Sequence, residues 1–331
     1  MRFLIIILAL ITLTACKREV PATMTFVAFG DAPNNRNEQI MYESLIKNIN
    51  EAKPSLVIHL GDTHSSKICN NNEIDNIRDY MNDFVAPVLY TPGDNDWTDC
   101  GNALDGDFNP LERLNYLRQT HFNSGTTLGK NPISVINQKK AGFPENMRFM
   151  KDNIGFITVH VVGNKNNLNT SDLDSMKEFY DRNKANLTWL DESFMALKKA
   201  DAIVVSFHSN MFVRKFTSFR NIALRIKHDK KLLLSYKTYG RLFYRTFKIV
   251  DRLSLPYRDI GRSIQHYSSE LKKPVLLLHG SDHDHTVYKP FKKNPYLHAI
   301  TVHGSPDVKA IEISVRPKSK RPFKVERVFN P

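Results

Sequence analysis

Five short hydrophobic runs stand out along the chain. They begin at Phe26, Leu56, Val88, Ile203 and Val275, and β-branched residues are frequent in them. Runs of this length and composition predict buried strands. Each run ends in residues that can bind a metal, namely Asp31, Asp62, Asp94, His208 and the stretch 279–285, which contains His283 and His285. Since the carboxyl ends of strands in an α/β sheet share the edge where ligands bind, we expect these side chains to converge.

Amphipathic stretches separate the strand-like runs. Apolar residues recur at helical spacing in 38–49, 74–84 and 170–197, with Ser171 and Asp172 as candidate caps of the last helix. The order strand, helix, strand up to Asp94 predicts parallel pairing with right-handed crossovers.

The second half of the chain contains further strand-like segments. Residues 149–162 read as a hairpin in a second sheet, and 297–302 and 310–315 continue the strand pattern. We therefore expect an α/β protein in which two packed sheets have helices outside.

Length and composition suit one large domain. The chain has 331 residues, of which 41% are hydrophobic, enough for a substantial core. The mean hydropathy of −0.39 argues against a protein with several membrane spans. No repeat of about 20–50 residues is visible, which argues against a solenoid or propeller.

The first sixteen residues look like an export signal. An apolar stretch from Phe3 to Leu13 is too short for a comfortable membrane span but suits a signal peptide. The following Leu-Thr-Ala-Cys resembles a bacterial lipobox, which implies cleavage before Cys16 and lipidation of its sulfur. Lys17 after the cysteine favours the outer membrane, facing the periplasm. The alternative is an ordinary secretory peptide in which Cys16 is incidental.

Two cysteines remain if Cys16 carries lipid. Cys69 and Cys100 each follow a Gly-Asp turn of neighbouring predicted strands. In an oxidising compartment this even count predicts a disulfide, and two buried free thiols are the alternative.

The strand ends present the ligands of a transition-metal site. Carboxylates and imidazoles that converge at one sheet edge can hold Zn, Mn or Fe ions. The pattern therefore predicts a metal-dependent hydrolase in a domain that spans residues 24–331.

The order of these motifs resembles the calcineurin-like metallophosphoesterase family. The family's Asp, Gly-Asp and Gly-Asn-His-Asp/Glu turns correspond to Gly30-Asp31, Gly61-Asp62 and Gly93-Asp94-Asn95-Asp96. Its lone His and its final Gly-His-x-His correspond to His208 and to Gly280-Ser281-Asp282-His283. The resemblance covers roughly 26–313 and implies a four-layer α/β/β/α sandwich of two mixed sheets flanked by helices.

The resemblance also implies a mechanism. Two divalent ions share a bridging carboxylate and a hydroxide that attacks a phosphate monoester or diester. By position Asp62 would bridge, Asp31 with His283 or His285 would bind one ion, and Asp94 with His208 would bind the other. Asn95, His64 and Asp96 are then the candidate catalytic residues, with His64 and His285 as candidate substitutes for missing ligands.

Several positions depart from the family pattern. Pro33 and Ser281 stand where the family has metal-binding histidines, Asp94 replaces an Asn ligand, and Asn95 replaces the His that assists the leaving group. An Asn cannot act as a general acid near neutral pH. An alternative function is therefore a catalytically impaired protein that binds an anionic ligand or a partner at the cell envelope. A third possibility is a structural lipoprotein without metal.

The chain is strongly basic. Its formal net charge is +13, and the excess is concentrated in a partly helical insert at about 212–273. We expect this insert to overhang the metal edge and to suit a phosphorylated small molecule or lipid, or an anionic membrane surface. A merely solvated basic face is the alternative. No nucleic-acid fold signature is present, and nothing points to a protein partner.

Overall fold

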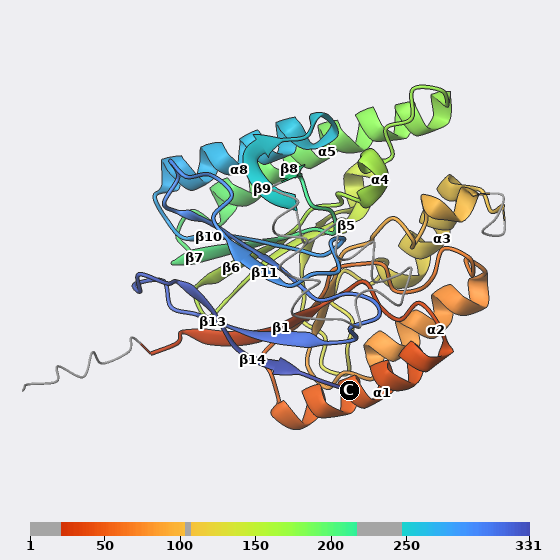
Figure 1. The fold of residues 1–331 in the computed structure, drawn as a ribbon, viewed down its shortest axis with the longest axis horizontal. Coiled ribbons are helices and arrows are strands. Elements are labelled where there is room, and N and C mark those ends of the chain that lie inside the picture. The colour runs from red at the N-terminus through yellow and green to blue at the C-terminus, as the bar shows by residue number, and fades with distance from the viewer. Residues whose placement is uncertain (1–20, 103–106, 217–246) are drawn as a thin grey trace, which may run out of the picture.

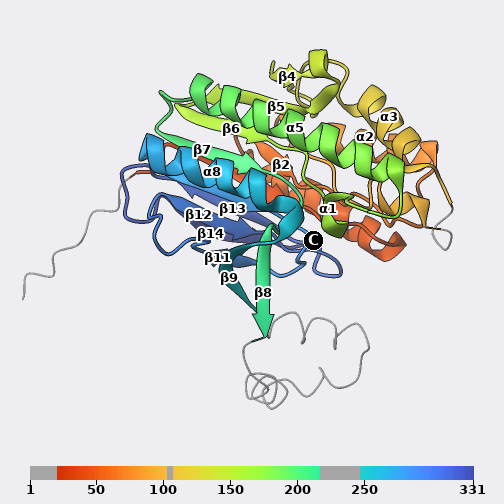
Figure 2. The same ribbon diagram turned by 90° about the horizontal axis from the view of Figure 1, so that it is seen from above.

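Two β-sheets pack face to face between outer helices (Figures 1 and 2). In the computed structural model the described residues are 21–102, 107–216 and 247–331. The predicted lipobox with Cys16, and residues 217–246 of the basic insert, lie outside these ranges. Among the described residues, no helix is both long enough and apolar enough to cross a membrane.

The first sheet carries the three aspartate turns. Within the described residues its strand order is β14-β13-β1-β2-β3. The strands are β1 (Met24–Phe29), β2 (Val57–His59), β3 (Val88–Tyr90), β13 (Ala310–Val315) and β14 (Phe323–Phe329). Strands β1, β2 and β3 are parallel, as the strand–helix–strand order predicts, whereas β13 is antiparallel to both of its neighbours, β1 and β14.

The second sheet has the order β11-β12-β10-β7-β6-β5-β4 in the described part of the chain. Its strands are β4 (Ile136–Gln138), β5 (Phe143–Lys151), β6 (Ile154–Thr158), β7 (Ala202–Ser206), β10 (Val275–His279), β11 (Thr286–Tyr288) and β12 (Leu297–Thr301). The predicted hairpin is the antiparallel pair β5–β6. Strands β6, β7, β10 and β12 are parallel, so their carboxyl ends point the same way.

Helices cover the outer faces of both sheets (Figure 1). Helices α1 (Arg36–Ala52) and α2 (Asn71–Asn82) lie on the first sheet, and α5 (Leu173–Ala196) and α8 (Arg258–Leu271) lie on the second. Helix α3 (Pro110–His121) and the short turn α4 (Gly163–Asn166) belong to the loops beyond the strand ends. Asp172 caps α5, as its sequence predicts, by accepting from the amide of Asp174. This layering confirms the predicted four-layer α/β/β/α sandwich.

The core follows from alternation along the central strands. Phe156 of β6 faces the first sheet and meets Phe26 edge-on, at 5.7 Å between ring centroids, whereas Ile157 faces the outer helices. Because neighbouring residues point to opposite faces, a strand buried on both faces must be apolar throughout. The short continuous hydrophobic runs of the sequence have this cause.

The basic insert contributes to two different parts of the structure. Strands β8 (Phe212–Phe216) and β9 (Phe247–Leu253) form a separate ribbon that leaves the sandwich (Figure 2). Helix α8 instead buries Ile260 and Ile264 against the second sheet. The end of the predicted insert is therefore a layer of the sandwich.

Cys69 and Cys100 form a disulfide, as predicted. Their Cα atoms are 5.8 Å apart, and the bond joins the loop after β2 to the short helix that follows β3. It thus links two loops that carry candidate site residues.

Candidate metal centre

Three aspartates follow the three parallel strands of the first sheet. Asp31 comes after β1, Asp62 after β2 and Asp94 after β3, so the parallel pairing brings them to one edge. Asp31 and Asp62 have positive φ values of 56° and 52°, in the left-handed region that costs a non-glycine residue energy. Both turns hold their carboxylates inward, since Asp31 and Asp62 are 0% and 6% exposed.

His208 reaches the same place from the second sheet. It follows β7, and its Nδ1 lies 2.7 Å from the carbonyl oxygen of Leu60. Because a carbonyl only accepts, Nδ1 must carry the hydrogen, and neutral His208 keeps its lone pair on Nε2. That Nε2 lies 2.8 Å from Asp94 Oδ1, 3.5 Å from Asp62 Oδ2 and 4.0 Å from Asp31 Oδ1. An imidazole prepared in this way is a typical metal ligand.

The cluster has the charge and geometry that a divalent cation requires. Ligand atoms of Asp31, Asp62 and His208 all lie within 4.8 Å of one another. Burial raises the pKa of Asp31 and of Asp62, and the Asp94 carboxylate raises the pKa of Asp62 further. Burial alone would lower the pKa of His208, but the carboxylates of Asp62, Asp94 and Asp31 together outweigh it and raise that pKa well above its usual value. Buried carboxylates this close repel each other, and a bound cation would relieve the repulsion.

Two glycines make the close approach possible. A Cβ on Gly93 would lie 2.2 Å from Asp62 Oδ1 and 2.8 Å from His208 Nδ1. A Cβ on Gly280 would lie 2.2 Å from Asp31 Oδ2. Any side chain at either position would displace a candidate ligand. This explains the glycine before Asp94 and the glycine that begins the motif 280–283.

The segment 280–285, which follows β10, brings one of its two candidate histidines to the cluster. His283 has Nδ1 2.9 Å from the carbonyl of Ser305 and Nε2 3.7 Å from Asp31 Oδ1. His285 instead places Nδ1 2.7 Å from the carbonyl of Thr301 and packs its ring 5.0 Å from that of His303. Of the two registers that the sequence leaves open, the geometry favours His283 as the ligand beside Asp31.

Ser281 and Pro33 replace family histidines without supplying a side-chain ligand. Ser281 donates its backbone N–H to both carboxylate oxygens of Asp31, at 2.8 and 3.0 Å. Pro33 follows Ala32 in a cis peptide bond. Neither residue offers a nitrogen ligand, so the described donor set is richer in carboxylate than the resemblance implies.

The three predicted catalytic residues occupy different environments. Asn95 is partly exposed, and its backbone N–H donates to Asp62 Oδ1 at 2.9 Å. His64 is 2% exposed, with Nδ1 2.9 Å from the carbonyl of Ser65 and no hydrogen-bond partner for Nε2 within the described residues. Their catalytic roles stay predictions.

Asp96 is fully buried and holds the ligand turns together. It accepts from the backbone amides of Asp62, Thr63 and Gly93 at 2.7–3.0 Å and from the hydroxyls of Thr63 and Tyr90. Burial alone would raise the pKa of Asp96, but the charge of His64 and these hydrogen bonds lower it to about 2. Its predicted catalytic role stays a prediction, and its contacts favour a positioning role.

Sequence reasoning missed a turn that supports Asp94. The N–H of Gly163 donates to Asp94 Oδ1 at 3.0 Å. The next four residues, Asn164–Asn167, all have positive φ values, a left-handed turn. Buried Arg182 of α5 holds this turn by donating to the side chain and the carbonyl of Asn166, at 2.6 and 3.0 Å. The run Gly-Asn-Lys-Asn-Asn was the available signal, since Gly and Asn tolerate left-handed geometry best.

A second missed network lies under the Asp94 turn. Trp97 donates its indole N–H to His160 Nε2 at 3.1 Å, and His160 Nδ1 lies 2.8 Å from Glu145. Since Nε2 accepts, Nδ1 carries the hydrogen and donates it to Glu145. Trp97 is fully buried and therefore supports the turn from beneath.

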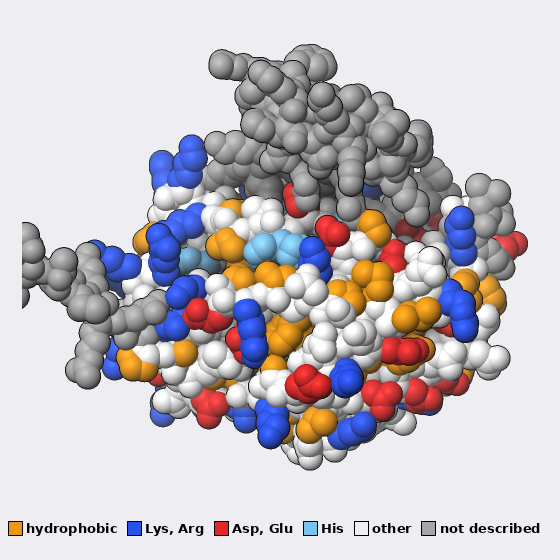
Figure 3. Space-filling model, turned by 60° about the horizontal axis from the view of Figure 1, so that its bottom comes forward, with side chains coloured by type: hydrophobic (Ala, Val, Ile, Leu, Met, Phe, Trp, Pro, Cys, Tyr) orange, Lys and Arg blue, Asp and Glu red, His pale blue; other side chains and the backbone are white. Residues whose placement is uncertain are grey.

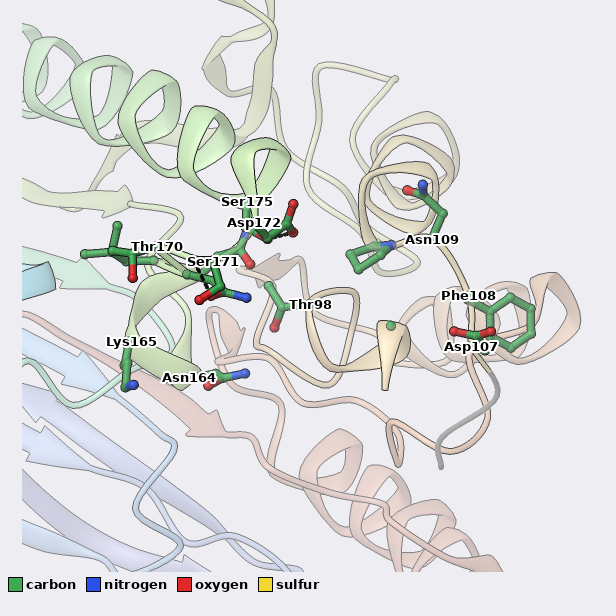
Figure 4. A pocket seen from close by; sticks show the side chains of 15 residues that line it. Thr98, Asp107, Phe108, Asn109, Asn164, Lys165, Thr170, Ser171, Asp172 and Ser175 are labelled. Carbon is green, nitrogen blue, oxygen red and sulfur yellow. Dashed lines mark hydrogen bonds between the residues drawn. The ribbon is translucent and has the colours of Figure 1, made fainter. Parts of the chain in front are cut away.

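A polar pocket adjoins the Asp94 turn (Figure 4). Its volume is about 830 Å³, and its lining includes Thr98, Phe108, Asn164, Lys165 and Asp172. The hydroxyl of Thr98 donates to the carbonyl of Asp94 at 3.0 Å, which joins the pocket wall to the metal centre.

Comparisons with known proteins agree with this arrangement. The family profile described as calcineurin-like phosphoesterase matches residues 24–231. A dimetal phosphatase from Danio rerio has a similar fold, with 10% identity and a TM-score of 0.52 over 92% of this chain and 99% of its own. GAP50, the anchor in the inner membrane complex of Plasmodium, aligns at 13% identity and a TM-score of 0.49 over 93% of this chain and 88% of its own. No curated protein matches the chain significantly.

Proposed function

Because this chain belongs to the calcineurin-like phosphoesterase family, a family of metal-dependent hydrolases, we propose that it hydrolyses phosphate monoesters or diesters as an exported, lipid-anchored protein. The observation that carries the activity is the convergence of Asp31, Asp62 and His208, with Asp94 beside them. A carboxylate-rich set with one or two imidazoles suits Mn, Fe or Zn.

The residues divide into two groups around Asp62. Asp31 and His283 would hold one divalent ion, Asp94 and His208 a second, and Asp62 lies between them. Bound there, such ions supply an activated water and neutralise charge on the phosphoryl oxygens. The chain itself would orient the ester through the partly exposed side chain of Asn95, whose amide can donate to a phosphoryl oxygen.

No histidine at position 95 would protonate the leaving group, and His64 is buried. The leaving oxygen would therefore either take a proton from solvent water or depart as an anion. Esters with good leaving groups, such as p-nitrophenyl phosphate, should therefore react better than alkyl phosphates.

The pocket beside Asp94 would receive the leaving group. Its lining is mostly amides and hydroxyls with Lys165, which suits a polar alcohol that carries the phosphate. Export and lipidation at Cys16 are supported by the lipobox resemblance alone.

Turnover of p-nitrophenyl phosphate and of its bis ester, with added Mn or Zn, tests the proposed activity. Asp62→Asn and His208→Ala should each lower kcat/KM by at least about 100-fold, as expected when a metal ligand is lost. The exposed substitution Lys140→Gln is the matched control and should change nothing.

Metal content separates the remaining possibilities. Stoichiometric metal without turnover of any ester would support the envelope-binding alternative that the Asn95 and Pro33 replacements favour. Absence of stoichiometric metal after dialysis against Mn or Zn would contradict both functions and leave a structural protein.

A further inference from the structure

Four turns form a basic edge on the sandwich, opposite the metal centre. They are residues 198–201, 272–274, 292–296 and 316–322, and the first three immediately precede β7, β10 and β12. Backbone hydrogen bonds from Ile203 to Pro274 and from Val275 to Tyr296 hold the first three turns side by side. The metal centre follows the carboxyl ends of the same strands, so the basic edge is the far end of the sheets.

The charge on this edge is almost entirely positive. The four turns contain ten Lys and Arg residues and one acid, Asp201. Within the part of the chain that the structure describes, eight of these cations have side chains without an ion-pair partner: Lys198, Lys199, Lys272, Lys273, Lys293, Lys318, Lys320 and Arg321. Lys and Arg side chains gather at the left end of the face in Figure 3. Such uncompensated charge attracts an anionic surface.

Local hydrogen bonding explains only part of this pattern. Lys273 donates to the carbonyl of Ala200 at 2.6 Å, in the turn between α5 and β7. The turn 316–322 lies between two strands of the other sheet. Lys320 and Arg321 instead line a groove of about 340 Å³ together with Lys289 and His298. Three cations around one groove suit a phosphate group.

The route to the predicted anchor leaves the protein at this edge. Strand β1 begins at Met24, which pairs with Val315, and the N–H of Thr23 donates to the carbonyl of Val315 at 2.8 Å. The chain therefore enters the sandwich beside the turn 316–322. Cys16 stands seven residues before Thr23, so a lipid on its sulfur lies within about 25 Å of this turn.

We propose that the basic edge docks on an anionic phospholipid bilayer and turns the metal centre away from it. The strands between the two edges are five or six residues long, which separates them by about 17–20 Å. The site would then face the aqueous phase, and its substrate would be a water-soluble phosphate ester and not a lipid of the same bilayer. This proposal rests on the lipid-anchored export proposed above, and not on the phosphoesterase activity.

Energy transfer to the bilayer tests the orientation. The exported, processed protein carries a donor dye on Ser319→Cys in the basic edge, or on exposed Thr170→Cys near the pocket. Vesicles contain a headgroup-labelled acceptor, either in phosphatidylcholine alone or with about one third phosphatidylglycerol. We expect stronger transfer from position 319 than from 170, an increase at 319 with phosphatidylglycerol, and loss of that increase at about 0.5 M salt.

Charge reversal identifies the residues responsible. Lys318→Glu combined with Lys320→Glu should reduce transfer from position 319 to its phosphatidylcholine value. Lys140→Glu combined with Lys184→Glu, two exposed lysines elsewhere, gives the same change in net charge and should preserve the transfer. Equal transfer from 319 and 170, indifference to lipid charge, or equal loss in both double variants would overturn the proposal. Circular dichroism confirms folding, and none of these readouts needs turnover, so an inactive protein still tests the docking.

Discussion

The backbone N–H of Gly163 donates a 3.0 Å hydrogen bond to Oδ1 of Asp94. The same carboxylate oxygen lies 2.8 Å from His208 Nε2. A left-handed turn of the backbone thus fixes the orientation of a candidate metal ligand, although the turn is distant from Asp94 in sequence. Such outer contacts commonly decide metal affinity.

Gly163→Ala should therefore weaken metal binding and turnover by about 10–100-fold with little loss of stability. A Cβ at this position would lie 2.3 Å from Asp94 Oδ1 and push the carboxylate aside. Metal titration and thermal unfolding measure the two effects separately. Lys184→Ala, which changes an exposed residue of α5 outside the turn and the pocket, is the control and should behave like the parent.

Arg182→Met should be among the most destabilising substitutions in α5. Arg182 is 0% exposed and pairs with Glu178, so its loss leaves a nearly buried carboxylate without its partner, at a cost of about 3–5 kcal/mol. The left-handed turn would relax as well, and turnover would fall in the fraction that remains folded. Lys177→Met, which breaks an exposed pair one helical turn away, should scarcely change the urea midpoint.

Asp96→Asn should make the free energy of unfolding less sensitive to a fall in pH. The pKa of Asp96 is about 2 in the folded protein, below its ordinary value of 3.8. Its contribution of about 2 kcal/mol is thus present above pH 4 and lost as the pH falls toward 2. The variant lacks this titration, so its unfolding free energy should change less between pH 5 and pH 2.5. If the unfolding free energy fell equally steeply with pH in both proteins, the pKa of Asp96 would not be lowered in the folded state.

His283→Ala should lower metal affinity more than His285→Ala. Only His283 places its Nε2 near Asp31, whereas His285 packs against His303. Calorimetric titration with Mn or Zn compares the two variants directly. Equal losses, or a larger loss for His285→Ala, would assign the ligand to the other register.

Reduction of the Cys69–Cys100 disulfide should cost about 3–4 kcal/mol of stability, because the bond closes a loop of about 31 residues. Urea unfolding with and without reductant measures this difference. The double substitution Cys69→Ser with Cys100→Ser should reproduce the reduced value and become insensitive to reductant.

The sequence predicted the sheets and the cluster because each depends on local pattern. Buried parallel strands must be apolar, and a ligand turn must follow such a strand, so Asp31, Asp62 and His208 could be found by position. The disulfide was predicted because two cysteines, Cys69 and Cys100, remain if Cys16 carries lipid. Even the strand 310–315 was visible, although its membership in the first sheet was not.

The supporting contacts could not be predicted, because they join distant segments through side-chain geometry. Nothing in the sequence near Arg182 indicates that it holds a turn at Asn166, or that Glu145 orients His160. The choice between His283 and His285 likewise depends on which backbone carbonyl each ring meets. Helix α8 was included in the basic insert because its charged residues drew attention away from the apolar face of Ile260 and Ile264, which packs on the second sheet.

The candidate ligands are divided between the two sheets, and this has a consequence for assembly. The three aspartates come from the first half of the chain, whereas His208 and His283 emerge from strands that the polypeptide supplies later. A nascent chain that stops before β10 would hold the carboxylates without their full set of imidazoles. Ion uptake should therefore be a late event, and a loaded centre would act as a clasp that keeps the two halves of the sandwich from separating.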